Sequence, residues 1–203
     1  LAGFLFLTSL TSLPPNDFWW HLKIGEMVYT THTIPTTNIF AWSLPADQPY
    51  VYAAWLGEWA LYVIYRWGGV ALVTFFRTLI VLVTFYLAAA EAHRRSRSWR
   101  IAALALASAC LMSLNNLIIR PQLWSLLPLV LVVFLMRRFA DGDLRWGWLL
   151  ACPLLMVLWV NAHGAFVLGI AVGGATTVGE FVTGWRKRCA SAWWRKPVWL
   201  ALV

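Results

Sequence analysis

The chain has 203 residues, of which 61% are hydrophobic and 12% are charged, and its net charge is +8. Soluble domains carry roughly twice this charged fraction, so the composition excludes a soluble globular protein and predicts an all-α integral membrane protein. The basic residues lie in short clusters between apolar segments. They therefore indicate membrane topology and exclude a nucleic-acid partner, which leaves the lipid bilayer as the first expected partner.

The apolar segments predict a polytopic helical bundle that forms a single transmembrane domain over residues 1–203. The chain begins and ends inside an apolar segment, so the first and last spans are partial and we expect a fragment of a longer protein. No small-residue cleavage site follows the first segment, which argues against a signal peptide. The predicted spans cover residues 1–13, 70–90, 101–119, 122–136, 146–160, 165–184 and 197–203.

Three clusters of Lys and Arg decide the predicted sidedness. Short loops that are rich in these residues remain in the cytoplasm. The loops 91–100, 137–145 and 185–196 are therefore expected on the cytoplasmic side. Two spans separate each cluster from the next, so all three can lie on the same side of the membrane.

This sidedness places residues 14–69 in one outer loop. The apolar segment 53–65 in this loop cannot cross the membrane without reversing the sidedness. We interpret it as an interfacial helix that ends at Gly68-Gly69. An earlier interfacial helix is expected after Pro14-Pro15, because the two prolines end the preceding helix and the Trp residues that follow prefer the headgroup level of a bilayer.

The start of this earlier helix carries two candidate catalytic residues. Asn16 or Asp17 can cap the helix with its side chain. Asp17 and His21 then lie four residues apart on one face, close enough to share a metal ion, a proton or a substrate hydroxyl. The alternative is an ordinary surface helix in which Asp17 is only an N-cap and His21 is solvated, and this stretch alone favours that alternative.

Two later turns on the outer side are polar. The spans around the turn 115–122 have purely apolar parts of only about 21 Å, against about 30 Å for the hydrocarbon core, so the turn is recessed or its polar residues enter the membrane. Arg120 at that depth needs an anionic partner and suits a phosphate. In the next turn, Asn161 and His163 are candidate hydrogen-bond donors. The candidate substrate-binding and phosphate-binding residues are Arg120, Gln122, Asn161, His163 and Glu58.

Each turn alone fits an ordinary structural role equally well. Arg120 could be an interfacial anchor whose side chain extends to the headgroups, and Asn161 and His163 could cap a helix. The convergence of both turns and of the Asp17–His21 stretch on one side of the membrane favours a functional site. The sequence has no Walker, GxGxxG, HExxH or GxSxG motif.

Several short motifs in their chain order resemble the bacterial GT-C glycosyltransferases, the lipid-linked-sugar transferases related to oligosaccharyltransferase, protein mannosyltransferase and aminoarabinose transferase. The resemblance covers most of the chain. It rests on Asp17 with Trp20-His21-Leu22 and Gly25-Glu26, on Ile34-Pro35-Thr36-Thr37, on Trp55-Leu56-Gly57-Glu58, on Arg120-Pro121-Gln122-Leu123-Trp124-Ser125 and on Trp159-Val160-Asn161-Ala162-His163-Gly164.

The resemblance implies a multi-pass protein of the bacterial cytoplasmic (inner) membrane that transfers a sugar from a polyprenyl-phosphate donor at the outer face. The catalytic acid just after the first span corresponds to Asp17, with His21 as its partner. Asp17 would act as general base or would hold a divalent cation with His21, and Arg120 would stabilise the leaving phosphate. Because family members are usually longer, the alternative is a non-catalytic subunit of a larger membrane complex.

Overall fold

A computed structural model describes residues 3, 17–113 and 119–194 of the chain. The predicted partial spans at the two ends, 1–13 and 197–203, lie outside these residues except for Gly3. The described part is helical, with no β-strand beyond one isolated bridge between Thr37 and Pro49. The helices are α2 (Phe18–Thr31), α3 (Trp55–Ser96), α4 (Trp99–Ser113), α5 (Leu123–Ala140), η2 (Trp146–Leu150), α6 (Ala151–Ala162) and α7 (Phe166–Trp194).

The all-helical class is confirmed, and α3, α5 and α7 are long and apolar enough to cross a membrane. Several helices run past the ends predicted for the spans. The predicted basic loops therefore begin on helices, because α3 continues to Ser96, α5 to Ala140 and α7 to Trp194. Arg side chains favour helical backbone and the helix C-terminus, so basic residues extend these helices where we expected a loop.

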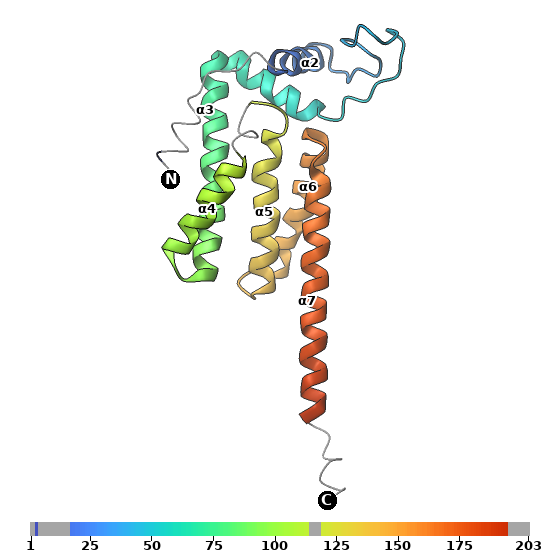
Figure 1. The fold of residues 1–203 in the computed structure, drawn as a ribbon. Coiled ribbons are helices and arrows are strands. Elements are labelled where there is room, and N and C mark those ends of the chain that lie inside the picture. The colour runs from blue at the N-terminus through green and yellow to red at the C-terminus, as the bar shows by residue number, and fades with distance from the viewer. Residues whose placement is uncertain (1–2, 4–16, 114–118, 195–203) are drawn as a thin grey trace, which may run out of the picture.

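Helix α3 is bent into two arms at a glycine pair. Gly69 has φ 59° and ψ −155°, a combination that essentially only glycine adopts, and Gly68 is also non-helical. The bend separates a short arm (residues 55–67) from a long arm (residues 70–96). Figure 1 shows α2 and the short arm lying across one end of the bundle, above the near ends of α5 and α6. The helix predicted in 53–65 and its end at the glycines thus agree with the structure.

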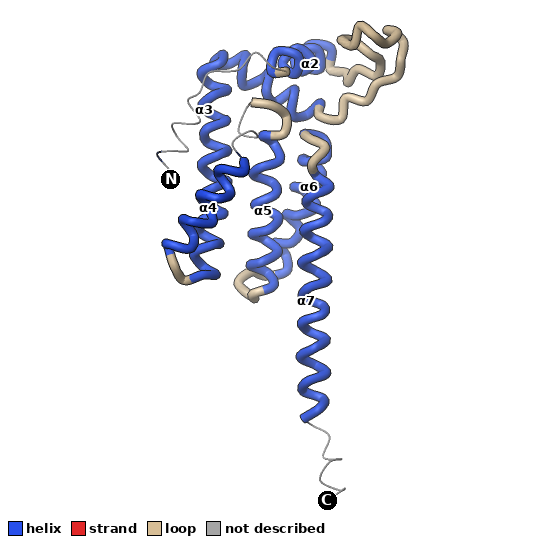
Figure 2. The backbone as a smooth tube through the Cα atoms, in the orientation of Figure 1, coloured by secondary structure: helices blue, strands red, loops and turns tan. Residues whose placement is uncertain are grey.

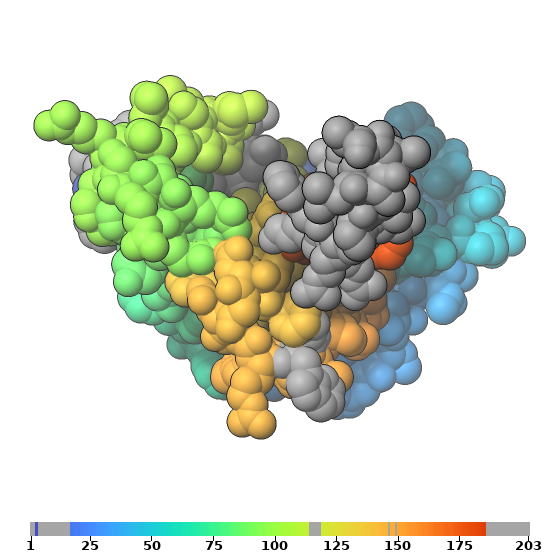
Figure 3. Space-filling view, turned by 90° about the horizontal axis from the view of Figure 1, so that it is seen from below, coloured from blue at the N-terminus to red at the C-terminus, as the bar shows by residue number. Residues whose placement is uncertain are grey.

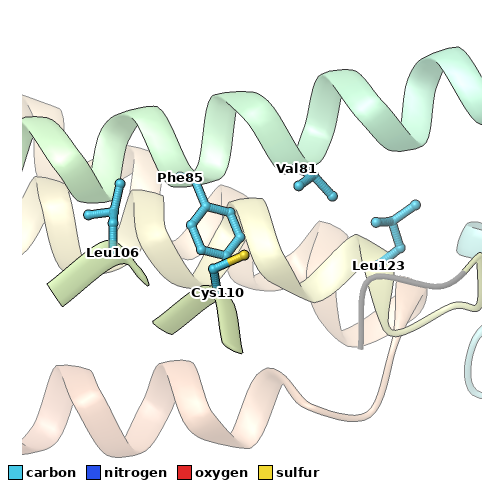
Figure 4. Close-up of a cluster of buried hydrophobic side chains, with 5 residues drawn as sticks. All are labelled: Val81, Phe85, Leu106, Cys110 and Leu123. Atoms are coloured by element: carbon cyan, nitrogen blue, oxygen red, sulfur yellow. The ribbon is translucent and has the colours of Figure 1, made fainter. Parts of the chain in front are cut away.

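Two apolar clusters connect these elements. Figure 4 shows Val81 and Phe85 of the long arm facing Leu106 and Cys110 of α4, with Leu123 at the start of α5 beside them. Cys110 is buried in this cluster, where it packs as a small apolar side chain. The second cluster joins α2 to both arms of α3 and consists of Phe18, Leu22, Leu61, Val73 and Ile119.

The opposite end of the bundle carries the first two basic clusters. Arg94 pairs with Glu91 at 2.9 Å and also with Asp141, which connects the end of α3 to the end of α5. Arg138 pairs with Asp143 at 3.1 Å. Figure 3 shows the ends of α3 and α4 (green) and of α5 with η2 (yellow and orange) side by side on this face. These ion pairs reduce the net charge of this end. The predicted sidedness does not change, because it depends on the number of Lys and Arg residues and not on the net charge.

Candidate functional site

The site begins where α2 lies directly on the short arm of α3. A Cβ atom at Gly25 would lie 2.1 Å from the carbonyl oxygen of Glu58, so only glycine permits this approach. The close packing brings His21 to Glu58, with 2.7 Å between His21 Nδ1 and Glu58 Oε1. Glu58 is 3% exposed. The second oxygen of its carboxylate is buried without a hydrogen-bond partner in the described part of the chain.

Asp17 precedes α2 and contacts Arg120 from the turn before α5. A carboxylate oxygen of Asp17 lies 3.4 Å from Arg120 Nη2. Asp17 occupies the N-cap position but makes no cap hydrogen bond with its side chain, so the predicted side-chain cap is wrong for Asp17. Asn16 and the predicted turn residues 115–118 lie outside the described residues. Arg120 Nε is buried, and no residue that the structure describes accepts a hydrogen bond from it.

His163 ends α6 and is held by a chain of hydrogen bonds. The indole N–H of Trp159 donates to Ser125 Oγ at 2.8 Å, and Ser125 Oγ lies 2.8 Å from His163 Nδ1. The backbone N–H of Ala165 also donates to His163 Nδ1, at 3.2 Å. Nδ1 therefore accepts hydrogen bonds, which places the proton of the neutral ring on Nε2. Burial lowers the pKa of His163, and the charge of His21 lowers it further.

Asn161 connects α6 to the short arm of α3, and Gln122 lies at the start of α5. Trp55 donates its indole N–H to Asn161 Oδ1 at 2.9 Å, and Asn161 Nδ2 donates to the carbonyl of Val157 at 2.8 Å. Both ends of the Asn161 amide are thus occupied within the protein. Gln122 is half-buried at the start of α5, where its backbone carbonyl oxygen accepts the backbone N–H of Ser125 at 3.0 Å.

The predicted site residues therefore meet at one end of the bundle, but in different pairs from those expected. Asp17 contacts Arg120, whereas His21 contacts Glu58. These contacts use only one ring nitrogen of His21 and one carboxylate oxygen of Asp17, so they do not by themselves decide on the divalent cation that the sequence suggested. Among the described residues, no group of three His, Cys, Asp or Glu side chains is placed to hold a metal ion.

An apolar cavity of about 490 Å³ adjoins this polar cluster. It lies between the two arms of α3, α5 and α6, and no charged residue lines it. The lining residues include immediate sequence neighbours of the cluster: Gly57 precedes Glu58, Trp124 precedes Ser125, and Ala162 precedes His163. The cavity is thus apolar and lies next to the polar cluster, and its lining matches the chemistry of an apolar chain.

Sequence reasoning missed the residues that position the site. Ser125 and Trp159 lay within predicted spans and were not chosen, although Trp159 lies one helical turn before His163. Gly25 and Gly57 were not chosen either. A Cβ atom at Gly57 would lie 2.7 Å from both Ala162 O and Trp124 Cδ1. Glycines in helix interiors are a signal of close helix packing that the sequence already contained.

These features define an all-helical protein with three helices suited to a membrane and a polar cluster at one end of its bundle, next to an apolar cavity. Comparison with protein-family models, with curated proteins and with solved structures returns no match to the chain.

Replacing Ser125 with Ala should destabilise the protein. The substitution removes the acceptor of the buried Trp159 N–H and a partner of His163, and an unpaired buried donor costs about 1–3 kcal/mol. We expect a lower midpoint of thermal unfolding, followed by circular dichroism in detergent. Ser108→Ala is the matched control, because the exposed Ser108 hydroxyl bonds only its own helix, at Leu104 O. Equal midpoints for the two variants would contradict the hydrogen-bond chain.

The lowered pKa of His163 predicts a specific dependence of stability on pH. The unfolded chain should bind a proton at this histidine near pH 6.5, the ordinary value, whereas the folded protein binds it only at lower pH. The contribution of His163 to stability is then complete above pH 6.5 and is lost as the pH falls from 6.5 to the folded pKa. Thermal unfolding of the protein and of His163→Gln across this range should show a shallower acid loss for the variant. Parallel curves would refute the prediction.

Proposed function

We propose that this chain carries the donor-binding and catalytic part of a GT-C-type membrane glycosyltransferase. It would transfer a sugar from a polyprenyl-phosphate donor to an acceptor hydroxyl or amine. The observation that carries the proposal is Arg120, a cation whose buried Nε donor has no partner among the described residues, in a cluster that borders an apolar cavity. Buried donors are almost always paired in proteins, so an open one favours a missing ligand. A phosphate joined to an apolar chain has both parts that this arrangement would bind.

In the proposed reaction, Asp17 takes the proton from the acceptor hydroxyl or amine. The acceptor atom then forms a bond to the anomeric carbon of the sugar, and the bond from that carbon to the phosphate oxygen breaks. The polyprenyl phosphate leaves with the electron pair of this bond. Arg120 stabilises the negative charge that develops on its phosphate. The 3.4 Å contact between Asp17 and Arg120 supports a base and a phosphate-binding cation that act at one place.

The other residues of the cluster have supporting roles in this proposal. Glu58 orients His21 through the 2.7 Å contact, and its second oxygen, which has no partner among the described residues, is an acceptor for a substrate hydroxyl. His163 is neutral with its proton on Nε2, which suits it to donate a hydrogen bond to a substrate oxygen. Asn161 acts as a positioning residue for the short arm, through the hydrogen bond that it accepts from Trp55. No step in this scheme requires a metal ion.

The proposal places the protein in a bacterial cytoplasmic membrane with the cluster on the outer side. In this orientation α2 and the short arm of α3 lie along the interface, and the basic ends of α3, α5 and α7 face the cytoplasm. The exposed Trp19 and Trp67 on these two helices support an interfacial position, because Trp prefers the headgroup level.

Arg120→Gln should weaken binding of a lipid phosphate without unfolding the protein. Loss of a charged hydrogen-bonding partner costs about 1.5–3 kcal/mol, or roughly tenfold to a hundredfold in affinity. Binding is measured with decaprenyl phosphate in lipid nanodiscs. Arg100→Gln is the matched control, since Arg100 is exposed and lies at the start of α4, at the other end of the bundle. Equal affinities for wild type and Arg120→Gln would contradict the assigned role.

A second candidate function is a non-catalytic subunit of a larger membrane complex. The observation that favours it is α7, which carries exposed apolar residues along much of its length, among them Ile170, Val178 and Phe181. This surface could contact another protein as well as lipid. Purification from native membranes would decide between the two functions. Stoichiometric recovery with a larger assembly, together with no binding of decaprenyl phosphate, would favour the subunit.

A further inference from the structure

The loop between α2 and α3 is held in a defined shape by Asn38. Its side-chain amide donates to the carbonyl of Ala41 at 2.8 Å, and its Oδ1 accepts the backbone N–H of Ala41 at 2.9 Å. The backbone N–H of Asn38 donates to Gln48 O at 2.8 Å, and that of Tyr50 donates to Thr36 O at 2.9 Å. Figure 2 shows this loop (tan) extending beyond α2. The two sides of the loop are thereby fixed to each other.

A pocket of about 250 Å³ lies between this loop and α2. Four aromatic residues contribute to its lining, together with Asn38 and Ala41: Trp20, Phe40, Tyr50 and Tyr52. The rings of Trp20 and Phe40 meet edge to face at 6.0 Å, and those of Tyr50 and Tyr52 lie 4.7 Å apart. Tyr52 is buried and donates its hydroxyl to Thr37 O at 3.2 Å, whereas the other three rings remain exposed. The pocket therefore offers preformed aromatic surface to a ligand.

The pocket adjoins the proposed catalytic centre. Trp20 stacks on His21, with ring centroids 5.3 Å apart and an angle of 15° between the planes. Trp20 also lies three residues after Asp17, so the two side chains leave α2 on neighbouring parts of its surface. A ligand against Trp20 would be next to both proposed catalytic residues.

We propose that this aromatic pocket binds a neutral pyranose ring, as the saccharide subsite of the glycosyltransferase proposed above, on which the inference rests. The faces of aromatic rings carry partial negative charge and attract the polarised C–H groups of a sugar. Tyr and Trp also offer large, rigid surfaces that are apolar with a polar tip. No charged residue lines the pocket, which disfavours a phosphate as occupant. An apolar lipid chain is better matched by the separate cavity of about 490 Å³.

The test is saturation-transfer NMR on the full chain in lipid nanodiscs that contain no glycolipid. The probes are the methyl glycosides of glucose, mannose, galactose and N-acetylglucosamine. We expect transfer to the ring C–H protons of at least one probe. Tyr50→Ala should weaken its binding about tenfold, the effect of one lost aromatic contact. Tyr50→Phe keeps the ring and should restore binding. Trp42→Ala is the matched control, because Trp42 is in the same loop, is 96% exposed and lies outside the pocket.

Absence of binding by the wild-type protein, or equal binding by wild type and Tyr50→Ala, overturns the subsite. Binding of decaprenyl phosphate, measured in the same nanodiscs, distinguishes failure of the saccharide subsite from failure of the transferase proposal. If that binding persists and depends on Arg120, only the saccharide subsite is wrong. If glycosides bind at the aromatic pocket but decaprenyl phosphate does not bind, the pocket is a saccharide-binding site, but the transferase proposal fails and with it the assignment of the pocket as the transferase subsite.

Glucose 1-phosphate distinguishes the two sources of the sugar. Weaker binding of this probe after both Tyr50→Ala and Arg120→Gln identifies the ring in the pocket as the donor sugar. If Tyr50→Ala weakens binding of the methyl glycoside alone, the ring belongs to a saccharide acceptor. Both results support the subsite.

Discussion

Asp17→Asn is expected to abolish sugar transfer while leaving the protein folded and able to bind the lipid donor. Asn keeps the size of the side chain but cannot accept the proton of the acceptor, and loss of a general base lowers the rate about a hundredfold to ten-thousandfold. Asp17 is half exposed and its contact with Arg120 is near the surface, so the contact contributes little to stability. The variant should therefore unfold at the wild-type temperature.

The affinity of the Asp17→Asn variant for the lipid donor tests whether Asp17 acts in the chemical step or in binding. Removal of the carboxylate leaves the charge of Arg120 without its partner, so the lipid phosphate should bind as well as before or more tightly. A fall in kcat with an unchanged or lower KM for the donor is the pattern expected for a group that acts in the chemical step. Asp47→Asn is the control, since Asp47 is an exposed acid in the loop between α2 and α3. Transfer that persists in Asp17→Asn would reject Asp17 as the base.

Gly25→Ala is expected to cause the largest loss of stability among single-methyl additions to α2. The new Cβ would lie 2.1 Å from a backbone oxygen and 2.7 Å from a backbone carbon of Glu58, and neither atom can move without shifting α3. Overpacking of this kind costs about 1–3 kcal/mol. This cost must exceed the roughly 0.5–1 kcal/mol by which Ala stabilises a helix interior relative to Gly. The midpoint of thermal unfolding should fall.

Gly174→Ala is the same type of substitution, but we expect it to raise the midpoint of thermal unfolding. Gly174 lies inside α7, and no described atom lies within 4 Å of its added Cβ. The helix propensity of Ala then acts alone and should raise stability. A midpoint that rises in both variants would show that α2 does not lie directly on the short arm. The pair of variants thus separates close packing from helix propensity.

The fold was predictable where a local signal and the charge pattern agreed. The segment 53–65 is short and apolar, and the basic clusters excluded it as a span, so a helix that ends at Gly68-Gly69 followed from the sequence. The ends of the spans were less predictable. Basic residues that we assigned to loops continue the helical backbone of α3, α5 and α7.

The sequence indicated which residues form the site better than it indicated which of them contact each other. Asp17 was expected to cap a helix, a local preference worth about 1 kcal/mol. Its contact instead is Arg120, which is distant in the sequence, so no local pattern contained it. The pairing of His21 with Glu58 likewise depends on the close approach at Gly25. Ser125 was missed for another reason. A single Ser within an apolar segment is common in membrane spans, so its sequence position gave no sign of a role in the site.

Because α3 bends at Gly69, a small change in backbone angle there moves the whole short arm. Glu58 lies about 15 Å along the arm from this corner, so a rotation of about 10° there would carry its carboxylate about 2.5 Å. That displacement is as large as the separation of 2.7 Å between Glu58 and His21. The angle at the glycine pair must therefore be held closely, and the packing at Gly25 and the hydrogen bond from Trp55 to Asn161 are the contacts that hold the short arm in this position.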